Sequence, residues 1–555
     1  MKLTGAQILI ETLIEQGVDT IFGYPGGSVL DIYDELYKNA DRINHVISAH
    51  EQGAAHAAEG YARASGRLGV VLATSGPGAT NLVTGIADAN LDSTPLLAIT
   101  GNVGTSVLGT DGFQEVDIVG VTYPIVKHSY QVKNVAKLAD TIREAMQIAQ
   151  SGRPGPVLID IPKDVQLAST EFENKEKISL FDNPPYDKAL IDRAVEMIAE
   201  SKRPFIYCGG GAAKERCCHD IMAFAEKIDA PIGTSMMGLA SIPASFKNGL
   251  GMCGMHGHYA STAAMYESDL IIAMGVRFSD RATGDKAKFS LDKKIIHIDI
   301  DPAEISKNIS VNLGITGDLK EVLCAINEKT VESKKPEWMA KIDEFRKYEE
   351  ENTYISPNKL TPYDIIDAVN AIKDEYSPVS TDVGQHQLWT SQRNKVHHSK
   401  TFITSGGLGT MGFGMGAAIG AAVATGRTSI LYTGDGSFGM NLNELATAVS
   451  QNLPLVVVLF NNGVLGNVRQ WQTMFYGERY SQTTLNRKTD FVKLAEAFGA
   501  KGFRADDKDS LDKALKEAFA SKSPCVVECI IDKDEMVLPM IPPGKSIDSL
   551  LMRFR

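Results

Sequence analysis

Short apolar runs that end in glycine-rich turns recur along the chain, and they constrain the fold more than any other feature. In the first third, "LGVVLAT" and "TPLLAIT" alternate with stretches of helical periodicity. The middle third contains "PFIYCGGG", "LIIAMGV" and "KIIHIDID", and the last third contains "SILYTG", "LPLVVVLF" and "SPCVVECII". Buried strands that alternate with helices form parallel sheets with helices on both faces. The sequence therefore predicts an α/β protein with three doubly wound parallel-sheet domains.

Two polar stretches separate these predicted domains. Residues 169–187 are charged and contain a proline pair, so we expect an exposed linker. Residues 329–358 lie in a charged region that we expect to form a solvated helical connector. The predicted domains are 1–168, 188–328 and 359–533, with a C-terminal tail at 534–555. A chain of 555 residues is long enough for several hydrophobic cores.

Composition and charge exclude some classes of function. The net charge is −12, with no clustering of Lys and Arg, which argues against nucleic-acid binding. No apolar run reaches the roughly 18 residues of a membrane-spanning helix, and the N-terminus lacks a signal-peptide core. The seven cysteines lack the spacing of a zinc site, so we expect buried, reduced thiols. These features predict a cytoplasmic protein with no membrane association.

Two oxygen-bearing side chains follow two apolar runs in the last domain. Asp435 stands in "TGDGSFG" and Asn462 in "FNNGVLG", 27 positions apart. The carboxyl ends of parallel strands meet at the ligand-binding edge of a sheet. Gly436 permits close approach of the backbone, and a helix expected at 441–449 points its first amides at a phosphate. Each turn alone is common, but together they predict Mg²⁺ that holds a diphosphate.

With these motifs, the last domain resembles the pyrophosphate-binding domain of thiamine-diphosphate enzymes, in which a GDG turn is followed by NN. The resemblance implies that Asp435, Asn462 and the main-chain carbonyl of Val464 hold Mg²⁺. The first domain then resembles the pyrimidine-binding domain, and "SAHEQGAAHAAEGYARASG" contains the matching glutamate, Glu51. Surrounding Ala and Gly residues leave little water to shield this carboxylate, which favours its protonated form and proton transfer to the aminopyrimidine. The alternative is that Glu51 caps or pairs within an ordinary surface helix.

Further motifs extend the resemblance over nearly the whole chain, to the catalytic subunit of acetohydroxyacid synthases, also called acetolactate synthases. The motifs are "YPGG" (24–27), "GTDGFQE" (109–115), "IVKHSY" (125–130), "GMHG" (254–257), "RFSDRATG" (277–284), "DVGQHQLW" (382–389), "VRQWQ" (468–472) and "PMIPPG" (539–544). That family joins pyruvate, with loss of CO₂, to a second pyruvate or to 2-ketobutyrate. The products, 2-acetolactate and 2-aceto-2-hydroxybutyrate, lead to the branched-chain amino acids.

The resemblance also implies cofactors and partners. Besides thiamine diphosphate and Mg²⁺, it implies FAD that is bound by the middle domain and plays a structural role. It implies a homodimer or homotetramer whose active site lies between the first domain of one chain and the last domain of another. A small regulatory subunit and feedback by branched-chain amino acids are implied in the same way.

Further site residues follow from matching positions in the family. Gly27 is implied to lie over the thiazolium, Gln114 to hold the substrate, and Gly409 to bind the aminopyrimidine through its carbonyl. Thiamine diphosphate contacts are also implied for Met411, Val383, Gln385, His386, Gly436 and Ser437. FAD contacts are implied for Gly209, Gly210, Ser235, Met236, Met237, His256, Gly275, Arg277, Asp299 and Asp318. Substrate contacts are implied for Lys127, Arg281, Trp471 and Asn467.

Three of these assignments are given a physical role, and for two of them a structural role is the alternative. Arg281 is expected to pair with the carboxylate of the second substrate, and Trp471 to pack on its alkyl group, which favours 2-ketobutyrate. Met411 is expected to wedge the cofactor into its bent form. Methionine and tryptophan are, however, also common core residues, so a purely structural role is the alternative for Met411 and Trp471.

Four positions depart from the family pattern and leave the acceptor open. Asn467 stands where Met is usual, Ser28 where Ala is usual, and Gly104 and Gly416 where Pro is usual. By resemblance, the first three lie at the substrate channel. The rival hypotheses are another carboligase or acetyltransferase that uses thiamine diphosphate, and a pyruvate oxidase whose flavin accepts electrons. A third rival is an inactive homologue that serves as a binding subunit, against which the intact site residues argue.

Overall fold

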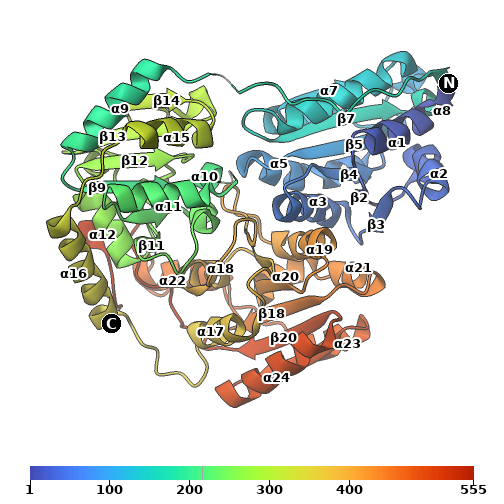
Figure 1. Ribbon diagram of the computed structural model, residues 1–555. Helices are drawn as coiled ribbons and strands as arrows, with labels where there is room; N and C mark the ends of the chain where they lie inside the picture. The colour runs from blue at the N-terminus through green and yellow to red at the C-terminus, as the bar shows by residue number, and fades with distance from the viewer. Residues whose placement is uncertain (184, 215–216, 555) are drawn as a thin grey trace.

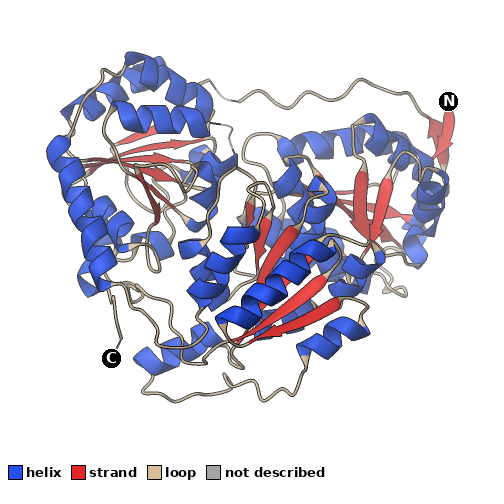
Figure 2. Ribbon diagram, turned by 60° about the horizontal axis from the view of Figure 1, so that its bottom comes forward, coloured by secondary structure: helices blue, strands red, loops and turns tan. Residues whose placement is uncertain are grey.

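A computed structural model describes residues 1–183, 185–214 and 217–554, so that Pro184 of the predicted linker and Arg555 of the predicted tail lie outside the described residues. The chain forms three domains, each built on a six-stranded parallel sheet (Figure 1). Helices cover both faces of the sheets (Figure 2). The predicted fold class is confirmed. The strands read as continuous apolar runs because a parallel sheet covered on both faces has no solvent side.

The first and third sheets share one topology. Numbered along each domain, the strands lie in the order 2-1-3-4-6-5 in both sheets. The first sheet contains β3 (Asn44–Ile47), β2 (Thr20–Gly23), β4 (Gly69–Ala73), β5 (Leu96–Asn102), β7 (Pro156–Pro162) and β6 (His128–Gln131). The third contains β16 (Phe402–Ile403), β15 (Val379–Thr381), β17 (Ser429–Gly434), β18 (Leu455–Asn461), β20 (Cys525–Ile530) and β19 (Lys501–Ala505).

Helices flank these two sheets. In the first domain they are α1 (Gly5–Glu15), α2 (Leu30–Lys38), α3 (Glu51–Ser65), α4 (Pro77–Asn81), α5 (Val83–Leu91), α6 (Ile118–Thr122), α7 (Leu138–Gln150) and α8 (Lys163–Leu167). In the third domain they are α17 (Pro362–Ile372), α18 (Gln385–Arg393), α19 (Phe413–Thr425), α20 (Asp435–Asn441), α21 (Glu444–Ser450), α22 (Gly466–Phe475), α23 (Phe491–Ala497) and α24 (Lys508–Ser521).

The middle sheet has a different topology. Its strands lie in the order 3-2-1-4-5-6, which is the order of dinucleotide-binding folds. They are β11 (Gly249–Met252), β10 (Ile232–Thr234), β9 (Pro204–Cys208), β12 (Leu270–Met274), β13 (Lys294–Asp299) and β14 (Leu313–Thr316). The helices are α9 (Lys188–Glu200), α10 (Gly210–Lys214), α11 (Cys218–Lys227), α12 (Tyr259–Glu267), α13 (Asp280–Thr283), α14 (Lys286–Phe289), α15 (Leu319–Lys329) and α16 (Pro336–Asn352).

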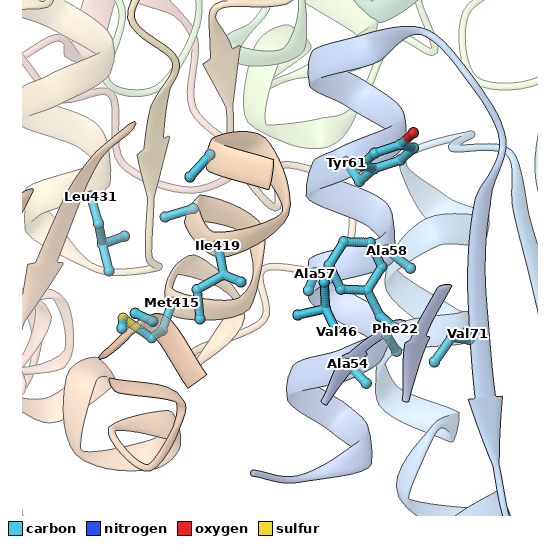
Figure 3. Packing of buried hydrophobic residues seen from close by; sticks show 14 of the residues in the cluster. Phe22, Val46, Ala54, Ala57, Ala58, Tyr61, Val71, Met415, Ile419 and Leu431 are labelled. Atoms are coloured by element: carbon cyan, nitrogen blue, oxygen red, sulfur yellow. The ribbon is translucent and has the colours of Figure 1, made fainter. Parts of the chain in front are cut away.

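Helices α3 and α19 join the first domain to the third (Figure 3). The facing residues are small, so the two backbones approach closely. A Cβ atom on Gly420 of α19 would lie 1.8 Å from the carbonyl oxygen of Ala57, and one on Gly60 of α3 would lie 2.1 Å from that of Ala417. Gly416, where the related family has Pro, lies in the same contact. The core around these helices therefore belongs to both domains.

Both predicted linkers are more structured than the charge pattern indicates. The start of the first forms β8 (Ser169–Glu171), which pairs antiparallel with β1 (Lys2–Thr4). In α16, Trp338, Ile342 and Phe345 are buried in a core of the middle domain. Their spacing of four and three residues places them on one helix face, which the surrounding charges obscure. The expected helical connector is confirmed as α16, but the expectation that it is solvated was wrong for this one face. The domain boundaries themselves stay predictions.

The segment after β20 packs between the third and middle domains. The amide of Gln470 in α22 donates to the carbonyl oxygen of Val537 (3.1 Å), and the backbone N–H of Ile541 donates to that of Met255 (2.8 Å). Val537 and Met540 are buried. The predicted tail is therefore a structural bridge.

The seven cysteines, all among the described residues, form no disulfide, in agreement with the predicted reduced state. Cys218 and Cys324 are half-buried, whereas the other five are buried. Every helix among the described residues is too short or too polar to cross a membrane.

Candidate active site

The carboxyl edge of the third sheet brings together the residues predicted to bind Mg²⁺. Asp435 directly follows β17, and Asn462 directly follows β18, the neighbouring strand. Asp435 is buried, and this burial raises its pKa to about 6 against the opposing effect of nearby backbone amides, Gly463 among them. Helix α20 starts at Asp435 itself and α21 at Glu444, so the single helix predicted at 441–449 was misplaced.

The turn after β18 is held by its own hydrogen bonds. The Asn462 Oδ1 atom accepts a hydrogen bond from the N–H of Val464 (3.2 Å), and Val464 forms an isolated bridge with Thr484. The backbone amide of Gly463, between Asn462 and Val464, hydrogen-bonds to Asp435, so the turn lies beside this carboxylate. A carboxylate, an amide oxygen and a carbonyl oxygen are the ligand types that Mg²⁺ prefers, so this set fits the metal.

The start of α18 faces the same edge. His386 is fully buried, its Nε2 atom has no partner among the described residues, and burial lowers its pKa to about 3. The Ser437 hydroxyl donates to the carbonyl of Val383 (2.7 Å), which links α20 to the turn before α18. The Gln385 amide is used within the protein, since it donates to Gln470 (3.0 Å) and to the Glu535 carbonyl (2.8 Å). An unpaired buried nitrogen beside two helix N-termini fits a bound phosphate.

Residues 404–412 form a loop that carries Gly409 and Met411. Gly409 has a φ of +75°, and a Cβ atom there would meet nothing within 4 Å. Met411 is half-buried, with its methyl group 3.8 Å from the position of a Cβ on Gly436. Met411 is therefore not enclosed in a core, and its side chain lies beside Gly436 at the carboxyl edge of the third sheet.

A cavity of about 1480 Å³ lies where the three domains meet, with residues 91–93 and 150–154 as the part of its wall from the first domain. Every residue predicted to contact FAD lines it except Asp318, namely Gly209, Gly210, Ser235, Met236, Met237, His256, Gly275, Arg277 and Asp299. Asp318 instead caps α15 and accepts a hydrogen bond from Asn183 (3.3 Å), which itself lines the cavity. Val383 and Gly409 line it from the third domain.

The middle sheet supplies this lining through its carboxyl edge. Gly209 follows β9 and Gly275 follows β12, and a Cβ on Gly209 would come within 2.0 Å of the Gly275 carbonyl oxygen. Only glycine allows the two backbones to pass at this distance. His256 has a buried Nδ1 atom without a partner among the described residues, and burial, together with Arg281, lowers the pKa of its imidazole to about 4.

Arg281 and Trp471 come from different domains and meet at the cavity wall. The Arg281 guanidinium carbon lies 5.7 Å from the centroid of the Trp471 ring. Both residues line the cavity, and so does Asn467 in the first turn of α22. Three of the four predicted substrate residues are therefore brought together.

Lys127, the fourth predicted substrate residue, does not line the cavity. Its ammonium donates to the carbonyls of Ile148 (2.5 Å) and Ser151 (2.7 Å) at the end of α7, and burial lowers its pKa to about 8. Of the departures predicted at the channel, only Asn467 lines the cavity. Ser28 is buried and bonds Thr74 (2.9 Å), and Gly104 has a φ of −60°, a value that proline also adopts.

The carboxyl edge of the first sheet gathers a separate group. Glu51 begins α3, is buried, and accepts a hydrogen bond from the Asn81 amide (2.9 Å). A surface-helix position for Glu51 is thereby excluded. Gln114 has a φ of +59° and packs against Gly76 after β4, while a Cβ on Gly27 would meet nothing within 4 Å. In the single chain, the cavity is lined by none of Gly27, Glu51 and Gln114.

Two buried acids escaped prediction. Asp382 follows β15 and accepts hydrogen bonds from the N–H groups of Val383 (3.0 Å) and Gly412 (2.7 Å). These bonds connect the turn before α18 to the end of the loop of residues 404–412. Glu444 accepts the N–H of His50 (2.9 Å) and so holds the turn before Glu51. Asp382 could have been found by the criterion that identified Asp435, because it too directly follows an apolar strand.

Comparison with known proteins agrees with this arrangement. Family models of thiamine pyrophosphate enzymes match residues 3–121 (N-terminal TPP binding domain), 191–326 (central domain) and 382–529 (C-terminal TPP binding domain). Fold and site thus define a thiamine pyrophosphate enzyme.

Full-length relatives give a narrower assignment. A "probable acetolactate synthase large subunit" of Methanocaldococcus jannaschii is 43% identical over 100% of this chain and 96% of its own. The acetolactate synthase large subunits of Cyanidium caldarium (43% identical, 99% and 96% covered) and Haemophilus influenzae (40%, 99% and 98%) are similar. The chain belongs to the acetolactate synthase large-subunit family.

Proposed function

We propose that this protein is the catalytic subunit of an acetohydroxyacid synthase. It decarboxylates pyruvate and joins the remaining two-carbon unit to a second pyruvate or to 2-ketobutyrate. Family membership supports the first half of this reaction. The observation that carries the second half is the meeting of Arg281 and Trp471 at the cavity wall, because a guanidinium beside an aromatic ring suits a carboxylate with a short alkyl chain.

Thiamine diphosphate and Mg²⁺ fit the edge of the third sheet. Asp435, Asn462 and the Val464 carbonyl would hold the metal, and Gly436, Ser437 and His386 face the place of the diphosphate. When bound, thiamine diphosphate supplies the electron sink for decarboxylation of a 2-keto acid. The residues around it bind and orient, and the buried surroundings exclude water.

Glu51 is the proton-handling residue in this proposal. It is buried, and Asn81 fixes one carboxylate oxygen, so that the other can exchange a proton with a ring nitrogen. Gly27 would leave room above the thiazolium, and Gln114 would hold the substrate. Because this group lies apart from the cavity in one chain, we propose that two chains, at least as a homodimer, complete each site.

FAD is proposed for the middle domain. The dinucleotide-type strand order, the close passage of Gly209 and Gly275, and the unpartnered His256 Nδ1 atom support it. Ligand sites commonly occupy about 300–1,000 Å³, so a cavity of about 1480 Å³ has room for a flavin beside a second substrate. A structural role for FAD, a cytoplasmic location and a small regulatory subunit complete the proposal; the last is supported by the "large subunit" names of the relatives.

The test is to purify the protein, record its flavin absorbance, and assay acetolactate from pyruvate with and without thiamine diphosphate and Mg²⁺. A parallel assay adds 2-ketobutyrate. We expect acetolactate only when both thiamine diphosphate and Mg²⁺ are present. Pyruvate consumption without acetolactate, coupled to reduction of oxygen or a quinone, would instead identify an oxidase. Product formation with a different acceptor, which the polar Asn467 at the cavity favours, would identify another carboligase.

A further inference from the structure

A cluster of buried acids lies behind the loop of residues 404–410, where the three domains meet. Glu59 on α3 and Asp88 on α5 are both 0% exposed, and Asp92, the residue after α5, is 5% exposed. Arg63 lies beside them, with its Nη1 atom 3.4 Å from Asp92 and 3.8 Å from Glu59. We call these four residues the acid cluster. Asp92 lines the large cavity, whereas Glu59, Arg63 and Asp88 do not, and none of the four was assigned a role in the site described above.

Asp88 is a member of the acid cluster that contacts the loop carrying Gly409 (residues 404–412), which we call the cofactor loop. Its Oδ1 atom accepts hydrogen bonds from the hydroxyls of Ser405 (2.5 Å) and Thr410 (2.8 Å). The Ser405 oxygen in turn accepts the backbone N–H groups of Gly409 (3.1 Å) and Thr410 (2.9 Å). The Thr410 N–H and the Gly409 carbonyl belong to one planar trans peptide and point in opposite directions. The link through Ser405 therefore directs the Gly409 carbonyl away from Ser405.

The rest of the cluster holds the loop at two further places. Asp92 accepts the N–H groups of Gly407 (2.7 Å) and Gly406 (3.2 Å). Arg63 donates to the carbonyl of Thr404 (2.6 Å). From the middle domain, the Lys214 ammonium donates to the Asp92 carbonyl (2.6 Å). Consecutive backbone groups of the loop are thus fixed by the first domain of the same chain.

One proton accounts for the unpaired atoms of the cluster. The Glu59 Oε2 and Asp88 Oδ2 atoms are buried without a partner among the described residues. Burial, together with the neighbouring Asp88 charge, raises the pKa of Glu59 well above its ordinary value. A protonated Glu59 that donates to Asp88 pairs both oxygens and leaves the Asp88 and Asp92 carboxylates beside the Arg63 guanidinium.

The third unpaired atom nearby is Nδ1 of His56, which lies with Glu59 and Asp88 in a group whose ligand atoms are within 4.8 Å of one another. Burial lowers the pKa of His56 to about 3, so its imidazole is neutral. A metal ion would add positive charge to a cluster that one proton already balances. The arrangement therefore favours a proton over a metal ion.

We propose that Asp88 is a positioning residue for the cofactor: it orients the Gly409 carbonyl through Ser405, with protonated Glu59 as its partner. This rests on the proposed function, in which that carbonyl binds the aminopyrimidine of thiamine diphosphate. Asp88 itself touches neither cofactor nor substrate. Its action on the Gly409 carbonyl passes through the Ser405 hydroxyl and one peptide plane, while the Thr410 hydroxyl is a second contact between Asp88 and the loop.

The test compares Asp88→Asn, Ser405→Ala and the double variant, with Asp160→Asn as the matched control. Asp160 is also a buried first-domain carboxylate, but its side-chain partners, Thr100 (2.8 Å) and Asn102 (2.6 Å), lie in its own domain. Amide hydrogen exchange of residues 404–412 is measured in cofactor-free protein, and the dissociation constant of thiamine diphosphate is measured at saturating Mg²⁺. The first measurement is independent of activity and of cofactor binding.

We expect Asp88→Asn and Ser405→Ala each to accelerate exchange of this segment at least about tenfold. Each should also weaken cofactor binding about 10- to 100-fold, since a hydrogen bond to a charged group contributes about 1.5–3 kcal/mol. The double variant should be no worse than the worse single variant, because both break one link. Asp160→Asn should leave the exchange of this segment unchanged.

Unchanged exchange in Asp88→Asn, or additive effects in the double variant, would overturn the positioning role. If Asp88→Asn does not fold, Ser405→Ala alone decides, because it removes the same link and must show the same two effects. Failure of the unmodified protein to bind thiamine diphosphate would instead refute the proposed function. In that case, the exchange data would still show whether Asp88 and Ser405 hold residues 404–412 in place.

Discussion

The first and third sheets have the same strand order but carry different groups at their carboxyl edges. At the first edge, the buried acid Glu51 is held by the amide of Asn81. At the third edge, Asp435 stands beside the turn that follows β18, whose Gly463 amide hydrogen-bonds to it. One topology therefore carries the proposed proton-handling acid at one edge and the proposed ligands of metal and diphosphate at the other. The difference lies in a few side chains at strand ends and not in the sheets.

The two edges also differ in their surroundings. The third edge is connected to the large cavity through the loop of residues 404–412 and through α22, whereas the first edge lies apart from it. The first domain nevertheless contacts the third, through the acid cluster and through the packing of α3 on α19. Substitutions at the two edges should consequently separate binding from turnover.

Asp435→Ala should have the largest effect. It removes the only carboxylate of the proposed ligand set, and several kcal/mol of metal-mediated binding correspond to a loss on the order of 10³-fold in thiamine diphosphate affinity. Titration of the cofactor in the presence of Mg²⁺ measures this loss, and turnover should disappear with it. Unchanged affinity would show that the third edge does not bind the cofactor.

Glu51→Gln should affect turnover while it leaves binding intact. Loss of a general acid–base group costs about 10²–10⁴-fold in rate, whereas the amide keeps the shape of the side chain. We expect kcat to fall within this range and the cofactor dissociation constant to stay within about twofold. Glu35→Gln, a buried acid on α2, is the control and should keep its activity. A parallel loss of cofactor affinity in Glu51→Gln would contradict the division of tasks.

Gly420→Ala should weaken the contact between the two domains. The added Cβ meets the Ala57 carbonyl, and overpacking costs about 1–3 kcal/mol, which exceeds the gain in helix propensity of about 1 kcal/mol. A lower midpoint of thermal unfolding is the expected result. Gly439→Ala in α20 is the control, because its Cβ would meet only the end of the flexible Arg487 side chain. Equal midpoints for the two variants would argue against close helix packing.

Asn467→Met should have the smallest effect, and only on the choice of acceptor. Exchange of a polar for an apolar side chain at the cavity wall should favour 2-ketobutyrate over pyruvate by up to about tenfold, the scale of one methylene in an apolar pocket. Competition between the two acceptors, with both products quantified, measures the ratio. Thr473→Val, on the same helix but outside the cavity lining, should leave the ratio unchanged. An unaltered ratio in Asn467→Met would exclude this position from acceptor selection.

Site residues can be predicted from the sequence most reliably where the local residue pattern and the expected topology agree. Asp435 and Asn462 were identifiable because each directly follows an apolar strand, and parallel strands end at a common edge. Asp382 meets the same criterion, yet its strand is only three residues long and gives a weak signal. Helix α16 was misjudged because its charges outnumber the three apolar residues that it buries.

The acid cluster could not be predicted for a different reason. Asp88 and Ser405 are 317 positions apart, and neither stands in a motif that points to the other. Only the packing of the first domain on the third reveals that an ordinary helical aspartate contacts the cofactor loop. The proximity of Arg281 to Trp471 is likewise a tertiary fact, although each residue was expected at the substrate.

The bridge formed by residues 536–541 has a consequence for biosynthesis. The ribosome produces Met255 and Gln470 well before Val537 and Ile541, so the wall between the middle and third domains stays open during most of translation. The Gln470 amide and the Met255 carbonyl have their bridge partners only after these late residues emerge. For the flavin proposed in the middle domain, this side of the site would therefore close only after residue 541 has been made.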